Sequence, residues 1–170
     1  TWAEVDLAAI RHKLSEIRSA LAPETMIGLV VKADAYGHGL IPVSRMALRS
    51  GADWACVATV QEGVALREAE IDSPILVLAP ALELEAQQVV FYDLRSQIES
   101  FDIARALSKA ATEQGRIAKV HIKIDTGMSR FGVQPSEAKE LAVRIASLPN
   151  VEIEALSSHF AFGGGPRDYT

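Results

Sequence analysis

The stretch "MIGLVVKADAYGHG", residues 26–39, decides the fold class of this chain. Its first part is an almost unbroken apolar run, which is typical of a strand buried on both faces of a parallel sheet. Lys32 ends that run, and a tyrosine and two glycines follow soon after it. A parallel sheet needs helices on its faces, so the rest of the chain should alternate between strands and helices.

The remaining sequence has this alternation. Strands are expected at residues 26–33, 54–59, 74–79, 92–97, 118–125 and 151–160, and helices at residues 6–22, 42–51, 60–70, 82–90, 99–114 and 135–147. Six strands separated by helices are compatible with an open doubly wound sheet or with a (β/α)8 barrel. A barrel has eight strands and typically about 250 residues. A barrel would therefore make this chain the first part of a longer protein.

Composition excludes several classes of partner. The 170 residues carry a net charge of −5, which argues against nucleic acid or an anionic membrane as the main partner. No apolar run approaches the roughly 18 residues that span a bilayer, and the N-terminal stretch lacks the apolar core of a signal peptide. The single cysteine, Cys56, cannot form an internal disulfide, and we expect it to be a core residue in a reducing cytosol.

Reactive side chains follow three of the expected strands. Lys32 and Tyr36 follow the first, "DTGMSR" at residues 125–130 follows the fifth, which also carries Lys123, and His159 closes the sixth. Ligands of parallel α/β sheets bind at the carboxyl ends of the strands. We therefore expect these side chains to meet at one rim.

Lys32 is the most informative of these residues. Burying an ammonium group is unfavourable, and in an apolar site the pKa of a lysine can fall to roughly 5–6. The neutral amine is a nucleophile that can form a Schiff base with an aldehyde. The alternative is a strand-end lysine that extends to solvent. The phenol of Tyr36 and the glycines after it, which allow close backbone approach to an anion, favour the reactive amine.

A dinucleotide-binding turn is a rival interpretation of the same stretch. "GHGLIP" at residues 37–42 supplies two glycines after a strand, but Pro42 stands in the place of the third, and a lysine interrupts the strand. A Walker-type phosphate loop is absent from the sequence. A nicotinamide cofactor is therefore disfavoured.

Four motifs resemble those of the alanine racemase family. They are "TWAEVDL" at residues 1–7, "VVKADAYGHG" at 30–39, "HIKIDTGMSRFGV" at 121–133 and "SSHFA" at 157–161, so the resemblance extends over nearly the whole chain. It implies an α/β fold of the (β/α)8 TIM-barrel type, followed by a β-rich C-terminal domain. On this basis residues 1–170 form an incomplete barrel domain that binds pyridoxal 5'-phosphate and contains about the first six βα units.

The resemblance also implies roles for five residues. Lys32 would hold pyridoxal phosphate as a Schiff base and act as one of two acid–base groups, while Tyr36 would bind the cofactor phosphate. Arg130 would bind the substrate carboxylate and the phenolic oxygen of the cofactor, and His159 would lie beside the pyridine ring. Lys123 corresponds to a lysine that is carbamylated in some members and helps to position the arginine. No metal ligand is expected.

Other parts of the family's active site are expected outside this chain. The second base is a tyrosine from the C-terminal domain of a partner subunit, and neither Tyr92 nor Tyr169 lies in its motif. The arginine that faces the pyridine nitrogen is also expected beyond residue 170. The resemblance thus implies a homodimer with a composite active site, and the 170-residue chain alone is not expected to racemise alanine. Ser129 and Phe131 stand where the family often has glycine and leucine.

Several side chains also have purely structural interpretations. Asp125 and Thr126 are residues that commonly bond their own turn. His121 alternates with Lys123, so both should point to one face of their strand, toward the interior. His12 and His38 are expected at the surface or in local hydrogen bonds, and the glycines at 163–165 are typical of a loop.

The resemblance therefore implies a pyridoxal-phosphate-dependent racemase, and the cysteine usage favours a cytoplasmic location. The racemase would interconvert L-alanine and D-alanine by a two-base mechanism that starts from the Lys32 Schiff base, supplying D-alanine for peptidoglycan. Two alternatives stay open: a racemase of broader specificity or one for serine or lysine, and a protein that binds pyridoxal phosphate without turnover.

Overall fold

A computed structural model describes residues 2–161 of the chain. The chain divides into two compact units, residues 1–76 and residues 77–170, and each is considered by itself. The glycines at 163–165 and Tyr169 lie outside the described residues. None of the helices within residues 2–161 has the length and apolar character of a membrane span.

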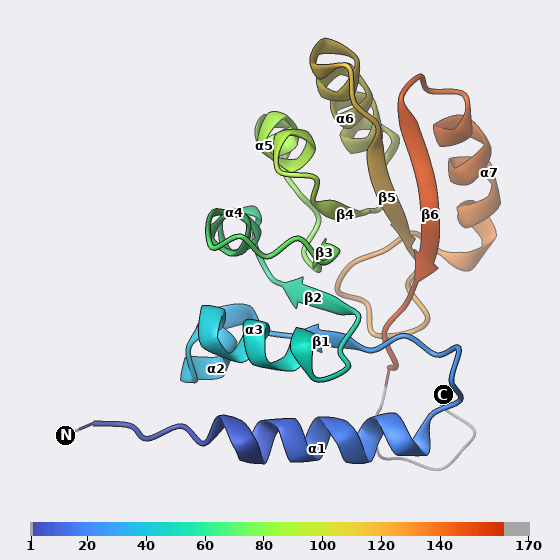
Figure 1. The fold of residues 1–170 in the computed structure, drawn as a ribbon. Coiled ribbons are helices and arrows are strands. Elements are labelled where there is room, and N and C mark those ends of the chain that lie inside the picture. The colour runs from blue at the N-terminus through green and yellow to red at the C-terminus, as the bar shows by residue number, and fades with distance from the viewer. Residues whose placement is uncertain (1, 162–170) are drawn as a thin grey trace. The chain divides into compact units, whose positions relative to one another are not determined.

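Both units are built from parallel strands that alternate with helices (Figure 1). Residues 1–76 contain α1 (Leu7–Ala20), β1 (Gly28–Val30), α2 (Lys32–Gly37), α3 (Leu40–Arg49), β2 (Trp54–Val57), α4 (Val60–Glu68) and the start of β3 (Ile75–Val77). Residues 77–170 contain η1 (Glu83–Glu85), α5 (Ala86–Phe91), β4 (Arg95–Ile98), α6 (Phe101–Gln114), β5 (Ala118–Lys123), α7 (Pro135–Ala146) and β6 (Val151–Ser157). In the first unit β1 pairs with β2, and in the second β4, β5 and β6 are neighbours in chain order. The predicted parallel α/β pattern is confirmed.

The first unit is organised around α1 and α3, which lie side by side in Figure 1. Leu14 of α1 packs with Ala47 of α3 in a small buried cluster. Asp53 fixes the connection to β1, because its Oδ2 accepts a hydrogen bond from the backbone N–H of Ile27 at 2.6 Å and also bonds Arg18. These hydrogen bonds hold the pKa of Asp53 below its usual value.

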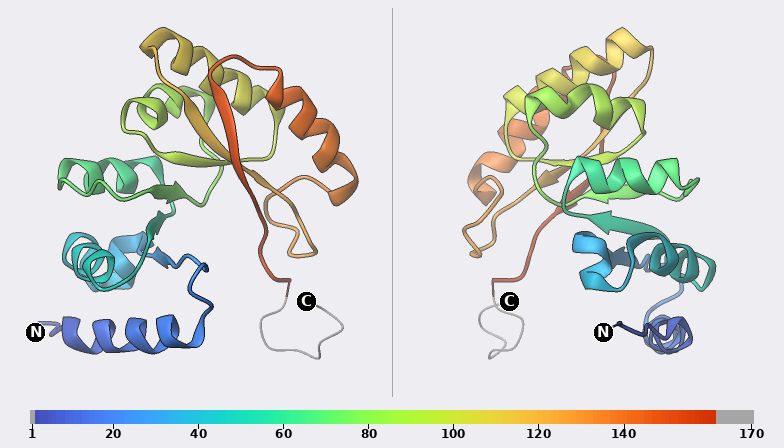
Figure 2. Two further views of the ribbon diagram at one scale, coloured as in Figure 1. Left: turned by 45° about the vertical axis from the view of Figure 1, so that its right-hand side comes forward. Right: turned by 90° about the vertical axis from the view of Figure 1, so that its left-hand side faces the viewer.

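The second unit has a larger apolar core. Its fully buried side chains include Ile98, Leu107, Val120, Ile122 and Ile145. Helix α6 contacts both α5 and α7, and Figure 2 shows the three helices in this order. Helix α6 ends at Gly115 in the left-handed conformation and α7 begins at Pro135, so both helix ends agree with their sequence signals.

A polar network lies inside this second core. His121 Nε2 and Glu154 Oε2 are 3.0 Å apart, and Arg95 Nε is 3.5 Å from the same carboxylate oxygen. Arg95 also bonds the carboxylate of Asp93 at 2.9 Å. A buried guanidinium costs several kcal/mol of desolvation unless it is paired. The prediction that the side chain of His121 points toward the interior is confirmed, since His121 is buried.

Cys56 lies in the core of the first unit, as predicted. Its burial raises the pKa of the thiol to about 11. The protonated thiol is a poor nucleophile, so Cys56 is a packing residue.

Candidate functional site

Lys32 lies two positions after the last residue of β1 and is half-buried. The four residues that follow it have φ values of 51–55°, so they form a left-handed turn although none is glycine. Left-handed backbone costs roughly 1–2 kcal/mol for each non-glycine residue. Strained backbone of this kind persists only where surrounding contacts hold it, and it gathers at functional sites.

Hydrogen bonds close this turn on itself. The N–H of Ala35 bonds the carbonyl of Val31 at 2.8 Å, and the N–H of Gly39 bonds the carbonyl of Asp34 at 2.9 Å. The Asp34 carboxylate accepts the N–H of Leu40 at 2.6 Å, which links the turn to the first residue of α3. The segment after Lys32 is therefore ordered rather than a flexible glycine loop.

The turn places Tyr36 next to Lys32. The Lys32 Nζ atom lies 6.0 Å from the centroid of the Tyr36 ring, within the range of a cation–π contact. Tyr36 is 59% exposed, so its phenol is accessible to a ligand. His38 Nδ1 is 2.8 Å from the carbonyl of Ala35, which confirms its predicted local role, and His12 is exposed as expected.

In the second unit Lys123 is the last residue of β5 and is only 7% exposed. Burial lowers the pKa of its amine, and the nearby guanidinium of Arg130 lowers it further, while Asp125 opposes both effects. A larger fraction of the amine is therefore neutral than in an ordinary surface lysine.

Residues 125–132 form the loop that carries Arg130. The loop is closed at its base, because Asp125 N bonds the carbonyl of Val133 and Val133 N bonds the carbonyl of Lys123, each at 2.9 Å. Asp125 Oδ1 accepts the N–H groups of Gly127 and Ser129 at 3.0 Å, and these bonds lower the pKa of its carboxyl group. The predicted turn-forming role of Asp125 is confirmed.

The hydroxyl of Thr126 bonds residues that are distant in sequence instead of its own turn. Its hydroxyl lies 2.6 Å from Ser158 Oγ and donates to the carbonyl of His159 at 3.2 Å, so it ties the loop to the end of β6. His159 itself lies two residues beyond β6, and its side chain is exposed.

Arg130 lies beside a cavity of about 510 Å³ that is also lined by Glu99, Asp125, Phe131 and Gly132. Its guanidinium carbon is 5.6 Å from the centroid of the Phe131 ring, a cation–π contact that an aliphatic side chain at this position would not provide. A planar guanidinium at the edge of an open cavity is suited to a carboxylate ligand. Within this unit the loop thus brings Lys123, Asp125 and Arg130 together.

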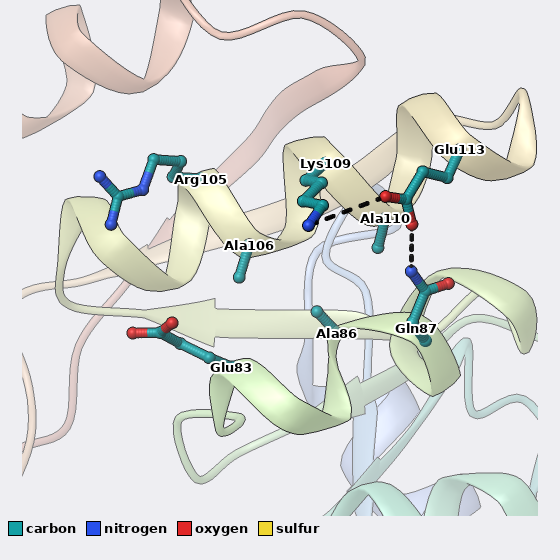
Figure 3. Close-up of a pocket in the computed structure, with 8 residues that line it drawn as sticks. All are labelled: Glu83, Ala86, Gln87, Arg105, Ala106, Lys109, Ala110 and Glu113. Atoms are coloured by element: carbon teal, nitrogen blue, oxygen red, sulfur yellow. Dashed lines mark hydrogen bonds and ion pairs between the residues drawn. The ribbon is translucent and has the colours of Figure 1, made fainter.

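A second cavity in this unit, of about 360 Å³, lies between α5 and α6 (Figure 3). Three of its polar side chains interact: Glu113 accepts a hydrogen bond from Gln87 at 2.6 Å and is 3.9 Å from Lys109. It contains none of the residues that the sequence predicted for the site.

Two carboxylate side chains accept backbone N–H groups close to Lys32 and Arg130, and the sequence did not indicate either of these contacts. Glu99, at the end of β4, accepts the N–H of Gly132, and Glu62 accepts the N–H of Ala33 at 2.6 Å. The pattern Thr59–x–x–Glu62 forms a capping box at the start of α4, and such a pattern is a local signal for a helix start but not for this second contact. No local signal in the sequence identified Glu99.

Ser129 has φ of 56°, a left-handed conformation that glycine adopts with less strain than serine. We expect Ser129→Gly to raise the free energy of unfolding by roughly 0.5 kcal/mol, the relief of left-handed strain less the greater entropy of an unfolded glycine. Ser129→Val should lower it, because a β-branched side chain tolerates this backbone less well. Denaturant unfolding of the full-length protein should give the order glycine, serine, valine; a valine variant more stable than the glycine variant would contradict it.

The fold and these residues define a parallel α/β protein whose ionisable side chains follow the carboxyl ends of strands. In parallel α/β proteins, ligand sites lie at this end of the strands. The chain belongs to the alanine racemase family, since the family model described as "Alanine racemase, N-terminal domain" matches residues 5–170. Its fold is accordingly TIM-barrel-like.

Similar proteins agree with this assignment. An alanine racemase of Symbiobacterium thermophilum is 43% identical over 167 residues, which are 98% of this chain and 44% of that protein. The solved alanine racemase of Clostridium difficile 630 matches with a TM-score of 0.92 and 33% identity over 95% of this chain and 43% of its own. That of Bacillus anthracis, solved with bound L-Ala-P, matches with a TM-score of 0.87 and 33% identity over 95% and 42%. The chain thus spans less than half the length of these relatives.

Proposed function

We propose that this chain is the barrel part of a pyridoxal-phosphate-dependent racemase that interconverts L-alanine and D-alanine. The observation that carries the proposal is the ordered left-handed turn that sets a half-buried amine, Lys32, beside the accessible phenol of Tyr36. Membership of the family supports the activity, and the L-Ala-P bound to the Bacillus anthracis protein supports alanine as the substrate.

The residues of the turn fit the cofactor. Lys32 offers a primary amine for the aldehyde, and Tyr36 offers a phenolic hydroxyl for the phosphate. Next to them Gly37 has no atom within 4 Å of the place a Cβ would take, so its backbone is open to an anion. When bound, pyridoxal phosphate supplies a ring system that withdraws electrons from the α-carbon of an amino acid.

The side chains of this protein would then bind the substrate and move its proton. We assign to Lys32 the transfer of the α-proton on one face, because a neutral amine is a suitable general base. The second base, a tyrosine, is assigned to a segment outside this chain. Arg130 would bind the substrate carboxylate, and its planar donors would fix the orientation of the α-carbon. His159 would contact the pyridine ring.

Lys123 is proposed to be carbamylated. Carbon dioxide reacts with a neutral amine, and the lowered pKa of Lys123 raises the neutral fraction. The product is an anion in place of a cation, and the Arg130 guanidinium, which destabilises the charged amine, would stabilise this anion. The modification would in this way help to hold Arg130.

The same proposal covers the whole protein. The relatives are more than twice as long as this chain, which supports a complete barrel and a C-terminal domain in the whole protein. A homodimer with a composite active site is part of the proposal, because the second base is assigned to a segment outside this chain. We place the enzyme in the cytoplasm, where D-alanine is needed for peptidoglycan precursors.

A racemisation assay tests this function. The full-length protein that contains this sequence is incubated with pyridoxal phosphate and with L-alanine, L-serine or L-lysine, and formation of each D-isomer is followed. We expect the highest kcat/KM with alanine. A higher kcat/KM with serine or lysine would make that amino acid, instead of alanine, the preferred substrate. No turnover with any of the three would favour a binding protein without catalysis.

A further inference from the structure

We propose that Glu62 is a positioning residue that fixes the peptide bond between Lys32 and Ala33, and with it the direction of the Lys32 side chain. The proposal rests on the proposed function of Lys32. Glu62 lies in the first turn of α4 and is half-buried, and all the residues concerned belong to the first unit.

The two oxygens of the Glu62 carboxylate have separate partners. Oε2 accepts the backbone N–H groups of Ala58 and Thr59 at 2.8 and 3.1 Å. Oε1 accepts the N–H of Ala33 at 2.6 Å. In a capping box the carboxylate of the N3 residue, here Glu62, needs to accept only the backbone N–H of the N-cap residue, here Thr59. The bond to Ala33 is therefore additional to the capping of α4.

Ala33 is the first residue of the left-handed turn, and its N–H belongs to the same peptide unit as the Lys32 carbonyl. Two hydrogen bonds thus restrain the backbone on either side of the lysine: Val31 N bonds the carbonyl of Cys56 at 2.8 Å, and Ala33 N bonds Glu62. A hydrogen bond to a carboxylate is about twice as strong as one between neutral groups.

Without the Glu62 carboxylate, the strained turn would be free to adopt more favourable backbone angles. Rotation of the Lys32–Ala33 peptide would then move the amine away from its direction beside Tyr36. Because catalytic groups must be held closely in the reacting geometry, a small displacement lowers the rate strongly. We therefore expect Glu62 to act on the chemistry through Lys32 without touching the substrate.

The simpler explanation is that Glu62 only stabilises the start of α4. Thr59→Ala provides the matched control, since it removes the reciprocal bond of the capping box, from Glu62 N to Thr59 Oγ1 at 3.3 Å, and leaves the carboxylate in place. Glu62→Gln retains a similar shape, but its amide has one accepting oxygen. We expect that oxygen to keep the two bonds to Ala58 and Thr59, so that the amide NH2 faces the N–H of Ala33 and the bond to Ala33 is lost.

The experiment uses the full-length protein freed of cofactor. Pyridoxal phosphate is added, and the visible absorbance that reports its bond to a lysine is followed with time, together with kcat, KM and the unfolding temperature. Glu62→Gln should slow the appearance of the absorbance at least roughly tenfold and lower kcat by roughly 10–100-fold, with a much smaller change in KM. Thr59→Ala should lower the unfolding temperature by a few degrees but leave the rate of cofactor attachment within about twofold.

A second-site variant tests the mechanism directly. Glycine adopts positive φ readily, so Ala33→Gly in the Glu62→Gln background should restore part of the attachment rate. A role confined to the cap of α4 predicts no such rescue.

Three outcomes would overturn the inference: attachment in Glu62→Gln as fast as in the unaltered protein, equal slowing in Glu62→Gln and Thr59→Ala, or no rescue by Ala33→Gly. Failure of the proposed function has a different signature. In that case the unaltered protein itself would show no visible absorbance with pyridoxal phosphate.

Discussion

Replacement of Lys32 by alanine in the full-length protein is expected to abolish racemisation and cofactor attachment together. The variant removes the amine that follows β1, and neither Asp34 nor Tyr36, which have the other ionisable side chains of the turn, supplies a primary amine to replace it. Loss of a general base alone typically costs 10²–10⁴-fold in rate, and loss of the covalent attachment adds to this. D-alanine formation should therefore fall by at least about 10⁴-fold.

Borohydride reduction gives a readout that does not depend on turnover. Reduction of the protein with pyridoxal phosphate should leave a stable pyridoxyl group on the Lys32 peptide, detected by mass spectrometry, and no label in Lys32→Ala. Lys13→Ala is the control, because Lys13 is an exposed lysine of α1 and its loss should change neither label nor rate. A label on another lysine of the unaltered protein would refute the assignment.

The alternation of strands and helices was predictable because it depends on local signals. Buried apolar runs marked the strands, and Gly115 and Pro135 marked helix ends that the structure has at the same residues. Strand lengths were less accurate: β1 contains only residues 28–30 of the predicted strand 26–33. Lys32 therefore lies outside the strand, in the turn that follows it.

The left-handed turn after Lys32 was not predictable in this way. Aspartate is enriched at positive φ, but alanine and tyrosine are not, so the residue types do not signal a turn of four such residues. The conformation depends on tertiary hydrogen bonds, above all the bond from Ala33 N to Glu62, which lies 29 residues away in sequence. Separation in sequence also hid the contact between Glu99 and Gly132.

The Arg130 loop shows the same division between local and tertiary signals. The turn formed by Asp125 followed from its residue type, and the burial of Lys123 followed from its alternation with His121. The lowered pKa of Lys123 did not follow, because it depends first on how far the fold buries the amine and then on where the loop places Asp125 and Arg130. The sequence thus predicted candidate site residues, and the structure adds the hydrogen bonds and neighbouring charges that surround them.

The largest structural effect is expected at Gly132, two residues after Arg130. Its φ is 116°, and a Cβ there would lie 2.7 Å from Asp125 N, 2.9 Å from the carbonyl carbon of Ile124 and 3.0 Å from the carbonyl oxygen of Lys123. These are backbone atoms at the closed base of the loop, so they cannot move aside as a flexible side chain would. Gly132→Ala should destabilise the protein by at least about 3 kcal/mol, from overpacking and backbone strain together.

Gly127→Ala separates these two causes. Gly127 has the same φ of 116°, but a Cβ there meets only the Ala161 side chain at 3.3 Å. It should therefore show the strain of about 1–3 kcal/mol without most of the overpacking.

In Gly132→Ala the loop must shift, and because a displacement of about 1 Å can lower the rate 100-fold, kcat/KM for alanine should fall by about that factor. Denaturant unfolding and racemisation assays measure both effects in the full-length protein. If the two alanine variants were equally stable and active, the backbone contacts of Gly132 would have no part in holding Arg130.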